Sequence, residues 1–194
     1  MRILFLGYEN SPLVEYIRTL GDEVVVTNDR IDADYVKNGG IEFIVSYGYR
    51  HMIKPDVLAV LPDKVINLHI ALLPWNRGAD PNFWSFAENT PKGVTIHHVD
   101  AGLDTGDIII QKEIVFPKKE TLGSSYQKLQ GEIQNLFQES WPDIRLGNCH
   151  RKPQPRGGTY HKVIDKESLF KLLPHGWDTS VSNVQNIFLK NKPD

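Results

Sequence analysis

The residues with the clearest chemical potential are Asn67 and His69, two positions apart in the stretch VINLHIALLPWNRGADPNFWS. Imidazole can transfer a proton near neutral pH, and an amide NH2 can stabilise a developing oxyanion. Residues two apart on a strand point to the same face, so both side chains can enter one cleft. The alternative is that both satisfy backbone groups of a loop, and the pair alone does not decide between these interpretations.

A second chemical motif is the turn AGLDTGD, which offers the carboxylates of Asp104 and Asp107 between Gly102 and Gly106. A carboxylate beside a histidine would orient the imidazole and stabilise its charged form. The glycines allow a sharp turn and a close backbone approach to a ligand. A turn that is rich in Asp and Gly only for conformational reasons is the alternative.

Other candidate groups carry weaker signals. His97 and His98 are adjacent on an expected strand, so only one of them can face the cleft side. The histidine spacing matches no usual zinc pattern, so no metal is expected, and neither a Gly-x-Ser-x-Gly nor a dinucleotide fingerprint is present. Asn10 and Ser11 follow the first strand and could hold an anion, although helix capping is the better interpretation.

Length, net charge and cysteine content limit the binding partners and the cellular location that the chain can have. The chain has 194 residues, a net charge of −2 and one cysteine, Cys149. We therefore expect one domain, or one domain with a short appendage, together with no nucleic-acid partner, no membrane span and a reducing, cytoplasmic location. The segment from Arg145 to Lys162 contains five Lys and Arg residues and no acidic residue. It could bind phosphate, but a solvated basic stretch is commoner.

The elements that must position these residues alternate between strands and helices. The strands are expected in ILFLG, EVVVTND, IEFIVSYG and KVINLHI, and helices are expected after Ser11-Pro12, from Pro55 to Val60 and after Asp80-Pro81. This alternation predicts an α/β fold with a mainly parallel sheet flanked by helices. Ligands of such sheets bind beyond the carboxyl ends of the strands, where Asn67 and His69 lie.

The second half of the chain has a different pattern. GVTIHHVDAGLDTGDIIIQKEIVF predicts two extended runs in a hairpin-like unit. Apolar residues then recur at helical spacing from Leu122 to Trp141, which predicts an amphipathic helix. One more short helix is expected after Asp165. We expect a catalytic domain over residues 1–145 and a short C-terminal extension over residues 146–194.

The ordered motifs NLHIALLPWNRG and GVTIHHVDAGLDTGDII resemble the folate-dependent formyltransferases over roughly residues 1–140. The resemblance implies a Rossmann-like sheet, 10-formyltetrahydrofolate as co-substrate and a catalytic set of Asn67, His69 and Asp104. It also implies a folate-binding wall made by the loop after the third strand and the loop before Asp104. Mapped onto this sequence, that wall comprises Gly48, Tyr49, His51, Ile53, Val99, Asp100, Gly102 and Leu103.

The stretch PWNRGADPNFWS indicates which substrate accepts the formyl group. It looks like the sugar N-formyltransferases that act on nucleotide-linked amino sugars. This branch implies a dTDP-linked amino sugar, a role in surface polysaccharide such as O-antigen, and a homodimer, although the short tail disfavours the usual dimer contact. Its substrate contacts would be Asn10, Ser11, Trp75, Asn76 and Arg77. Glycinamide ribonucleotide formylation and a non-catalytic folate-binding module are the alternatives, whereas the short tail leaves too little room for a tRNA-binding domain.

Overall fold

A computed structural model of the chain describes residues 1–191. The chain forms two compact units that interleave along the sequence. Unit 1 comprises Met1–His69, Ile96–Ile110 and Gln134–Pro153. Unit 2 comprises Ile70–Thr95, Gln111–Ile133 and the chain from Gln154 onward. A functional boundary at residue 145 stays a prediction.

A six-stranded sheet has the order β2-β1-β3-β4-β6-β7. Its strands are β1 Arg2–Gly7, β2 Glu23–Thr27, β3 Phe43–Tyr47, β4 Val65–His69, β6 Gly93–His98 and β7 Ile108–Glu113. The pairs β1–β2, β1–β3 and β3–β4 are parallel. The predicted α/β class with a mainly parallel sheet is therefore confirmed.

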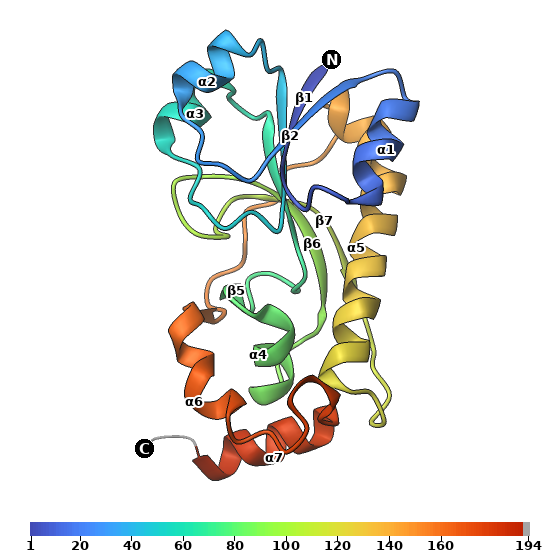
Figure 1. Ribbon diagram of the computed structural model, residues 1–194, viewed down its shortest axis with the longest axis vertical. Helices are drawn as coiled ribbons and strands as arrows, with labels where there is room; N and C mark the ends of the chain where they lie inside the picture. Colours follow the sequence, from blue (N-terminus) through green and yellow to red (C-terminus); the bar gives the residue numbers. More distant parts are fainter. Residues whose placement is uncertain (192–194) are drawn as a thin grey trace. The chain divides into compact units, whose positions relative to one another are not determined.

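Helices cover both faces of the sheet within unit 1 (Figure 1). Leu4 and Leu6 of β1 face a core that they share with Val36 of α2 (Ala33–Asn38) and Val57 of α3 (Pro55–Val60). Ile3 and Phe5 alternate to the opposite face and are also fully buried, which explains the uninterrupted apolar run. Helix α2 was not predicted; its start is set by Asp32, whose carboxylate accepts the Tyr35 N–H at 2.7 Å.

The opposite face is covered by α1 (Pro12–Thr19) and by the unit 1 part of α5 (Leu122–Arg145) (Figure 1). Trp141 packs edge-on against Phe43 of β3, with ring centroids 5.0 Å apart. The predicted helix is confirmed but runs past Pro142, which has no N–H to bond to the Gln138 carbonyl. Tyr16 of α1 supplies that donor instead, because its hydroxyl donates to the Gln138 carbonyl at 2.8 Å.

The predicted hairpin-like unit is formed by β6 and β7, which are neighbours in the sheet. At one end the His98 N–H donates to the Asp107 carbonyl at 2.9 Å. At the other end Gly93 lies so close to Lys112 that an added Cβ would stand 2.3 Å from its carbonyl oxygen. The two strands therefore run in opposite directions, and their connection carries Asp104.

Unit 2 is built around α4 (Pro81–Ala87), α6 (Glu167–Phe170) and α7 (Val181–Asn191), with two short 3-10 turns at Val163–Lys166 and Gly176–Asp178. Phe83 and Trp84 share a core with Leu122, Leu173 and Val184. Two short strands, β5 (Arg77–Gly78) and β8 (Tyr160–His161), pair in parallel. Neither β8 nor α7 was predicted from the sequence.

One predicted helix start has a different physical basis. Helix α4 begins after Asp80, as expected, but the Asp80 side chain does not cap it. Asp80 has a positive φ of 53°, and its carboxylate accepts from the Lys166 ammonium instead. Pro81 alone therefore provides the local start signal, because its fixed φ suits the first helical position.

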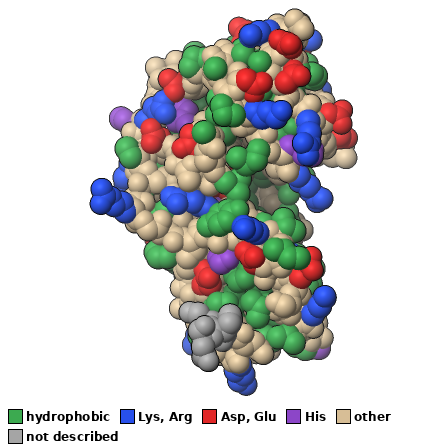
Figure 2. All heavy atoms as spheres, turned by 90° about the vertical axis from the view of Figure 1, so that its left-hand side faces the viewer, with side chains coloured by type: hydrophobic (Ala, Val, Ile, Leu, Met, Phe, Trp, Pro, Cys, Tyr) green, Lys and Arg blue, Asp and Glu red, His purple; other side chains and the backbone are tan. Residues whose placement is uncertain are grey.

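The surface carries mixed charges. On the face drawn in Figure 2, Lys and Arg side chains are interspersed with Asp and Glu side chains, in keeping with the net charge of −2. No helix within residues 1–191 is long and apolar enough to cross a lipid bilayer.

Candidate active site

Strand β4 delivers two polar side chains from an apolar base. Val65, Ile66 and Leu68 are buried and fix the strand in the sheet. Asn67 lies opposite Ser46 in the parallel register with β3, and His69 is the last residue of the strand. Asn67 and His69 thus occupy the carboxyl end of β4, as predicted.

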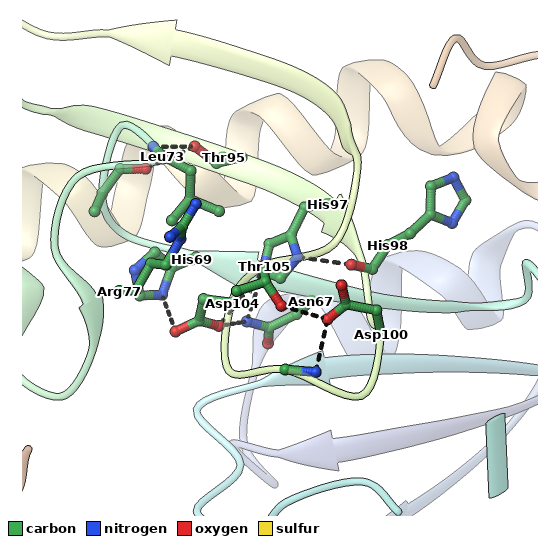
Figure 3. Close-up of polar contacts among 12 residues, drawn as sticks. Asn67, His69, Leu73, Arg77, Thr95, His97, His98, Asp100, Asp104 and Thr105 are labelled. Atoms are coloured by element: carbon green, nitrogen blue, oxygen red, sulfur yellow. Dashed lines mark hydrogen bonds and ion pairs between the residues drawn. The ribbon is translucent and has the colours of Figure 1, made fainter. Parts of the chain in front are cut away.

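The connection between β6 and β7 presents Asp104 in a left-handed backbone conformation with a φ of 53°. The Asp100 carboxylate holds this loop, because it accepts the Gly102 N–H at 3.0 Å and the Thr105 hydroxyl at 2.6 Å. Gly106 lies against β6, where an added Cβ would stand 1.9 Å from the His98 carbonyl oxygen. The glycines and Asp100 therefore set the position of Asp104 (Figure 3).

The three predicted catalytic side chains come together around this carboxylate (Figure 3). Asp104 Oδ2 is 3.7 Å from Nδ1 of His69, and Asp104 Oδ1 accepts from the Asn67 amide at 3.1 Å. The Asp104 side chain is only 10% exposed and that of His69 only 8%, so their attraction is weakly screened by solvent. Asp107, the second carboxylate of the turn, pairs instead with Arg151 at 3.2 Å.

His97 joins this cluster and was not assigned a role from the sequence. Its Nε2 is 3.2 Å from the Asn67 amide nitrogen and 3.5 Å from Asp104 Oδ1. Its Nδ1 is 2.8 Å from the His98 carbonyl, which can only accept, so Nδ1 carries a proton. In the neutral ring Nε2 then accepts from Asn67, whose two amide hydrogens point to Asp104 and His97. We call Asn67, His69, His97 and Asp104 the carboxylate cluster.

The alternation of β6 explains why His97 and not His98 belongs to the cluster. The His98 ring points away from it (Figure 3), is buried, and has no hydrogen-bond partner for either ring nitrogen among the described residues. Burial, assisted by the nearby Arg151 charge, lowers the pKa of His98 below its usual 6.5. His98 is therefore neutral at physiological pH.

A cavity in unit 1 adjoins the carboxylate cluster. It is lined by Asn67, His97 and Asp104 and by both predicted loops, which contribute Tyr49, His51, Ile53, Val99, Asp100, Gly102 and Leu103, together with Ser46 and Met52. The Tyr49 hydroxyl donates to the Asp29 carbonyl at 2.7 Å, and burial raises its pKa, so it stays neutral. The wall is thus largely uncharged apart from its carboxylates.

Gly48 is the one predicted wall residue that does not line this cavity. It has a φ of 75°, and an added Cβ would lie 2.5 Å from the Tyr8 ring. A side chain at this position would collide with Tyr8, so Gly48 serves the turn that directs the following residues to the cavity.

The predicted acceptor contacts divide between the units. In unit 1, Asn10 is exposed, whereas Ser11 is buried and its hydroxyl accepts the Leu13 N–H at 3.2 Å. Ser11 therefore caps α1, which is the interpretation that the sequence favoured. In unit 2, Trp75, Asn76 and Arg77 follow Pro74 in consecutive positions, and Asn76 is fully buried.

Some of the cations in the basic stretch from Arg145 to Lys162 form ion pairs within the protein. Arg145 binds the buried Asp22 carboxylate at 2.7 Å, and Arg151 pairs with Asp63 and Asp107. Two of the five cations of the stretch are therefore used in ion pairs within the protein. Among residues 1–191, no group of three or more His, Cys, Asp or Glu side chains is arranged to hold a metal ion.

Comparison with protein families decides the relationship. The formyl transferase model matches residues 13–140, more than half of the chain. The chain belongs to the formyl transferase family. Two curated methionyl-tRNA formyltransferases, from Acetivibrio thermocellus and Syntrophus aciditrophicus, are 29% and 33% identical over 154 and 151 residues. These alignments cover 78% and 75% of this chain but 48% and 46% of those proteins, so the chain spans about half the length of these curated relatives.

Solved structures of formyl transferases also resemble the chain. The formyltransferase PseJ from Anoxybacillus kamchatkensis, in complex with UDP-4,6-dideoxy-4-formamido-L-AltNAc and tetrahydrofolate, is 48% identical with a TM-score of 0.91. The match covers 95% of this chain and 97% of PseJ. A 4-N formyltransferase from Francisella tularensis is 23% identical with a TM-score of 0.78, covering 96% and 85% of the two chains, and shares the fold.

Proposed function

We propose that this formyl transferase moves a formyl group from 10-formyltetrahydrofolate to the amine of a nucleotide-linked amino sugar. The observation that carries the proposal is the carboxylate cluster, which joins Asn67, His69 and Asp104 beside a cavity. The similarity to PseJ supports the substrate class, because that protein is solved with tetrahydrofolate and a UDP-linked formamido sugar.

In the proposed reaction the neutral amine attacks the formyl carbon, and a carbon–nitrogen bond forms while the carbonyl oxygen becomes an oxyanion. Protonated His69 and the Asn67 amide donate hydrogen bonds to this oxyanion. Because both Asn67 hydrogens already have acceptors, one of those bonds must be exchanged for the oxyanion. The oxyanion then collapses, and the bond from the formyl carbon to the folate nitrogen breaks.

Proton transfer is the task proposed for Asp104. The attacking amine loses a proton as its bond to carbon forms, and the departing folate nitrogen gains one. Asp104 can accept the first proton and assist its passage to the second site, since its carboxylate already contacts His69 and Asn67. Contact with Asp104 also orients the His69 ring toward the reacting groups.

The folate is proposed to bind in the cavity of unit 1. The rim includes the aromatic rings of Tyr49 and His51, whose centroids are 5.3 Å apart. Ile53, Val99 and Leu103 add apolar surface, and Ser46, Asn67 and Asp104 add polar side chains. This combination suits a flat heterocycle with polar edges.

The nucleotide is the least constrained part of the proposal. The sequence favours a dTDP-linked sugar, whereas the ligand of PseJ is a UDP-linked sugar. We propose UDP, because PseJ matches this chain at 48% identity over nearly its whole length. Trp75 and Arg77 are the proposed contacts to the acceptor. Asn76 is fully buried and its side chain bonds to Thr90 and Thr159, so it supports the turn rather than contacting the ligand.

The test is a formyl-transfer assay with 10-formyltetrahydrofolate and a panel of UDP-, dTDP- and GDP-linked amino sugars and glycinamide ribonucleotide. We expect turnover of a UDP-linked amino sugar, lost in Asn67→Ala and His69→Ala while folate binding and thermal unfolding are kept. Turnover of glycinamide ribonucleotide alone would overturn the proposal. Folate binding without turnover of any acceptor would favour a non-catalytic module.

A further inference from the structure

Arg77 in unit 2 is a partly buried cation with an unusual partner. Its Nε and Nη2 atoms both donate to the side-chain oxygen of Gln154, at 3.1 and 2.6 Å. Within the described chain no carboxylate lies within ion-pair distance of Arg77, and the other partly buried arginine, Arg145, is paired with Asp22. Arg77 is therefore oriented by a neutral group and keeps its full positive charge.

Holding the Arg77 charge against a neutral oxygen costs free energy. Partial burial of a charge without a counter-charge is unfavourable, and a carboxylate at residue 154 would relieve it. A guanidinium has five N–H donors, and Gln154 engages two of them, which leaves three without a protein partner among residues 1–191. A planar fork of this kind suits the oxygens of a phosphate or a carboxylate.

The loop that carries Gln154 is fixed against the turn that carries Arg77. The backbone N–H of Asn76 donates to the Thr159 hydroxyl at 2.9 Å, and that hydroxyl donates to the Asn76 side-chain oxygen at 3.2 Å. Gly158 has a φ of 91°, and an added Cβ would stand 2.0 Å from the Pro74 carbonyl oxygen. Residue 154 is thus held at a defined place relative to Arg77.

We infer that Gln154 is a positioning residue, which aims the Arg77 guanidinium at an anionic group of the substrate without neutralising it. The inference rests on the proposed function, which supplies the pyrophosphate of a nucleotide-linked sugar as that anion. We call Arg77, Gln154, Asn76 and Thr159 the Arg77 clamp. The Gln154 amide oxygen orients Arg77 as a glutamate carboxylate would, but it leaves the positive charge of the guanidinium available to the ligand.

Two variants separate positioning from simple support of the fold. Gln154→Glu keeps an acceptor for Arg77 and strengthens the contact, but its carboxylate offsets the positive charge of the guanidinium. Gln154→Met keeps the length of the side chain and removes the acceptor. Gln127→Glu, at an exposed position of α5, adds the same charge elsewhere in unit 2 and is the matched control.

The experiment measures UDP and uridine binding by calorimetry, then KM and kcat for the nucleotide-linked acceptor. We expect Gln154→Glu to weaken UDP binding and raise KM by about tenfold or more, with uridine binding, kcat and thermal unfolding little changed. Gln154→Met should have a smaller effect of the same kind, and Gln127→Glu none. Wild-type UDP affinity in Gln154→Glu would overturn the inference.

The outcomes also separate this inference from the proposed function. Charge-dependent UDP binding without turnover of any nucleotide amino sugar would leave the clamp in place and refute the reaction. Turnover with a KM that neither Gln154 variant changes would leave the reaction in place and refute the clamp. A wild-type protein that binds UDP no better than uridine also refutes the clamp.

Discussion

The carboxylate cluster of unit 1 and the Arg77 clamp of unit 2 treat charge in opposite ways. In the cluster one carboxylate, Asp104, contacts two imidazoles and an amide, so it has several hydrogen-bond partners and two ring nitrogens with which a proton can be exchanged. In the clamp one cation, Arg77, is held by a neutral oxygen and has no group with which to exchange a proton. The first arrangement suits a reaction, and the second suits recognition of a fixed anion.

The largest expected effect comes from removing the charge of the cluster. Asp104→Asn keeps the shape of the side chain but removes the carboxylate that contacts His69. We expect kcat to fall by about a thousandfold or more, because orientation of the imidazole and proton transfer are lost together.

Single-turnover kinetics, with circular dichroism to establish folding, would measure this loss. Asp56→Asn, an exposed carboxylate on α3, is the matched control and should behave as the wild type. Activity of Asp104→Asn within tenfold of the wild type would remove Asp104 from the mechanism.

The next effect tests whether the cluster works as a network. His97→Phe keeps a ring in place but leaves one Asn67 hydrogen and the His98 carbonyl without their partners. We expect a loss of about 1–3 kcal/mol, a tenfold to hundredfold decrease in kcat, with little change in KM for the folate. His97→Gln should restore part of kcat, because its amide oxygen can accept from Asn67. No difference between the two variants would argue against this positioning role.

A smaller effect is expected in the clamp. Thr159→Val removes the hydroxyl that bonds to Asn76, and it should lower the free energy of unfolding by about 1–2 kcal/mol. Because the same hydroxyl fixes the loop of Gln154, KM for the acceptor should also rise while kcat stays near the wild-type value. Urea denaturation and steady-state kinetics would measure both. Thr19→Val, an exposed threonine on α1, is the control.

The smallest effect concerns His98, which lies outside both sites. Its folded-state pKa is lowered, so below about pH 6.5 the unfolded chain binds the extra proton first. Its contribution to stability is therefore present above that pH and is lost as pH falls toward the folded pKa. The slope is at most about 1.4 kcal/mol per pH unit. His98→Gln should flatten the pH dependence of urea denaturation between pH 6.5 and the lowered pKa; an unchanged slope would refute the assignment.

Local sequence patterns were enough to predict most of unit 1. Continuous apolar runs gave the buried strands, and Ser11, Pro12 and Pro55 gave helix starts, because these signals act through neighbouring residues. Helix α2 was missed although Asp32 caps it, since only Val36 is buried within its six residues and so short a helix shows little periodicity.

The sequence by itself predicted that Asn67 and His69 share a strand face, and the resemblance of its ordered motifs singled out Asp104 as their partner. The structure brings the three side chains together, with Asp104 in contact with both Asn67 and His69. The sequence could show that one of His97 and His98 faces the cluster, but only the tertiary structure decided that it is His97, through contacts with residues 30 and 7 positions away. The Gln154–Arg77 contact joins residues 77 positions apart in a segment without periodicity. Long-range pairs of this kind depend on how loops pack, and local propensity carries no information about them.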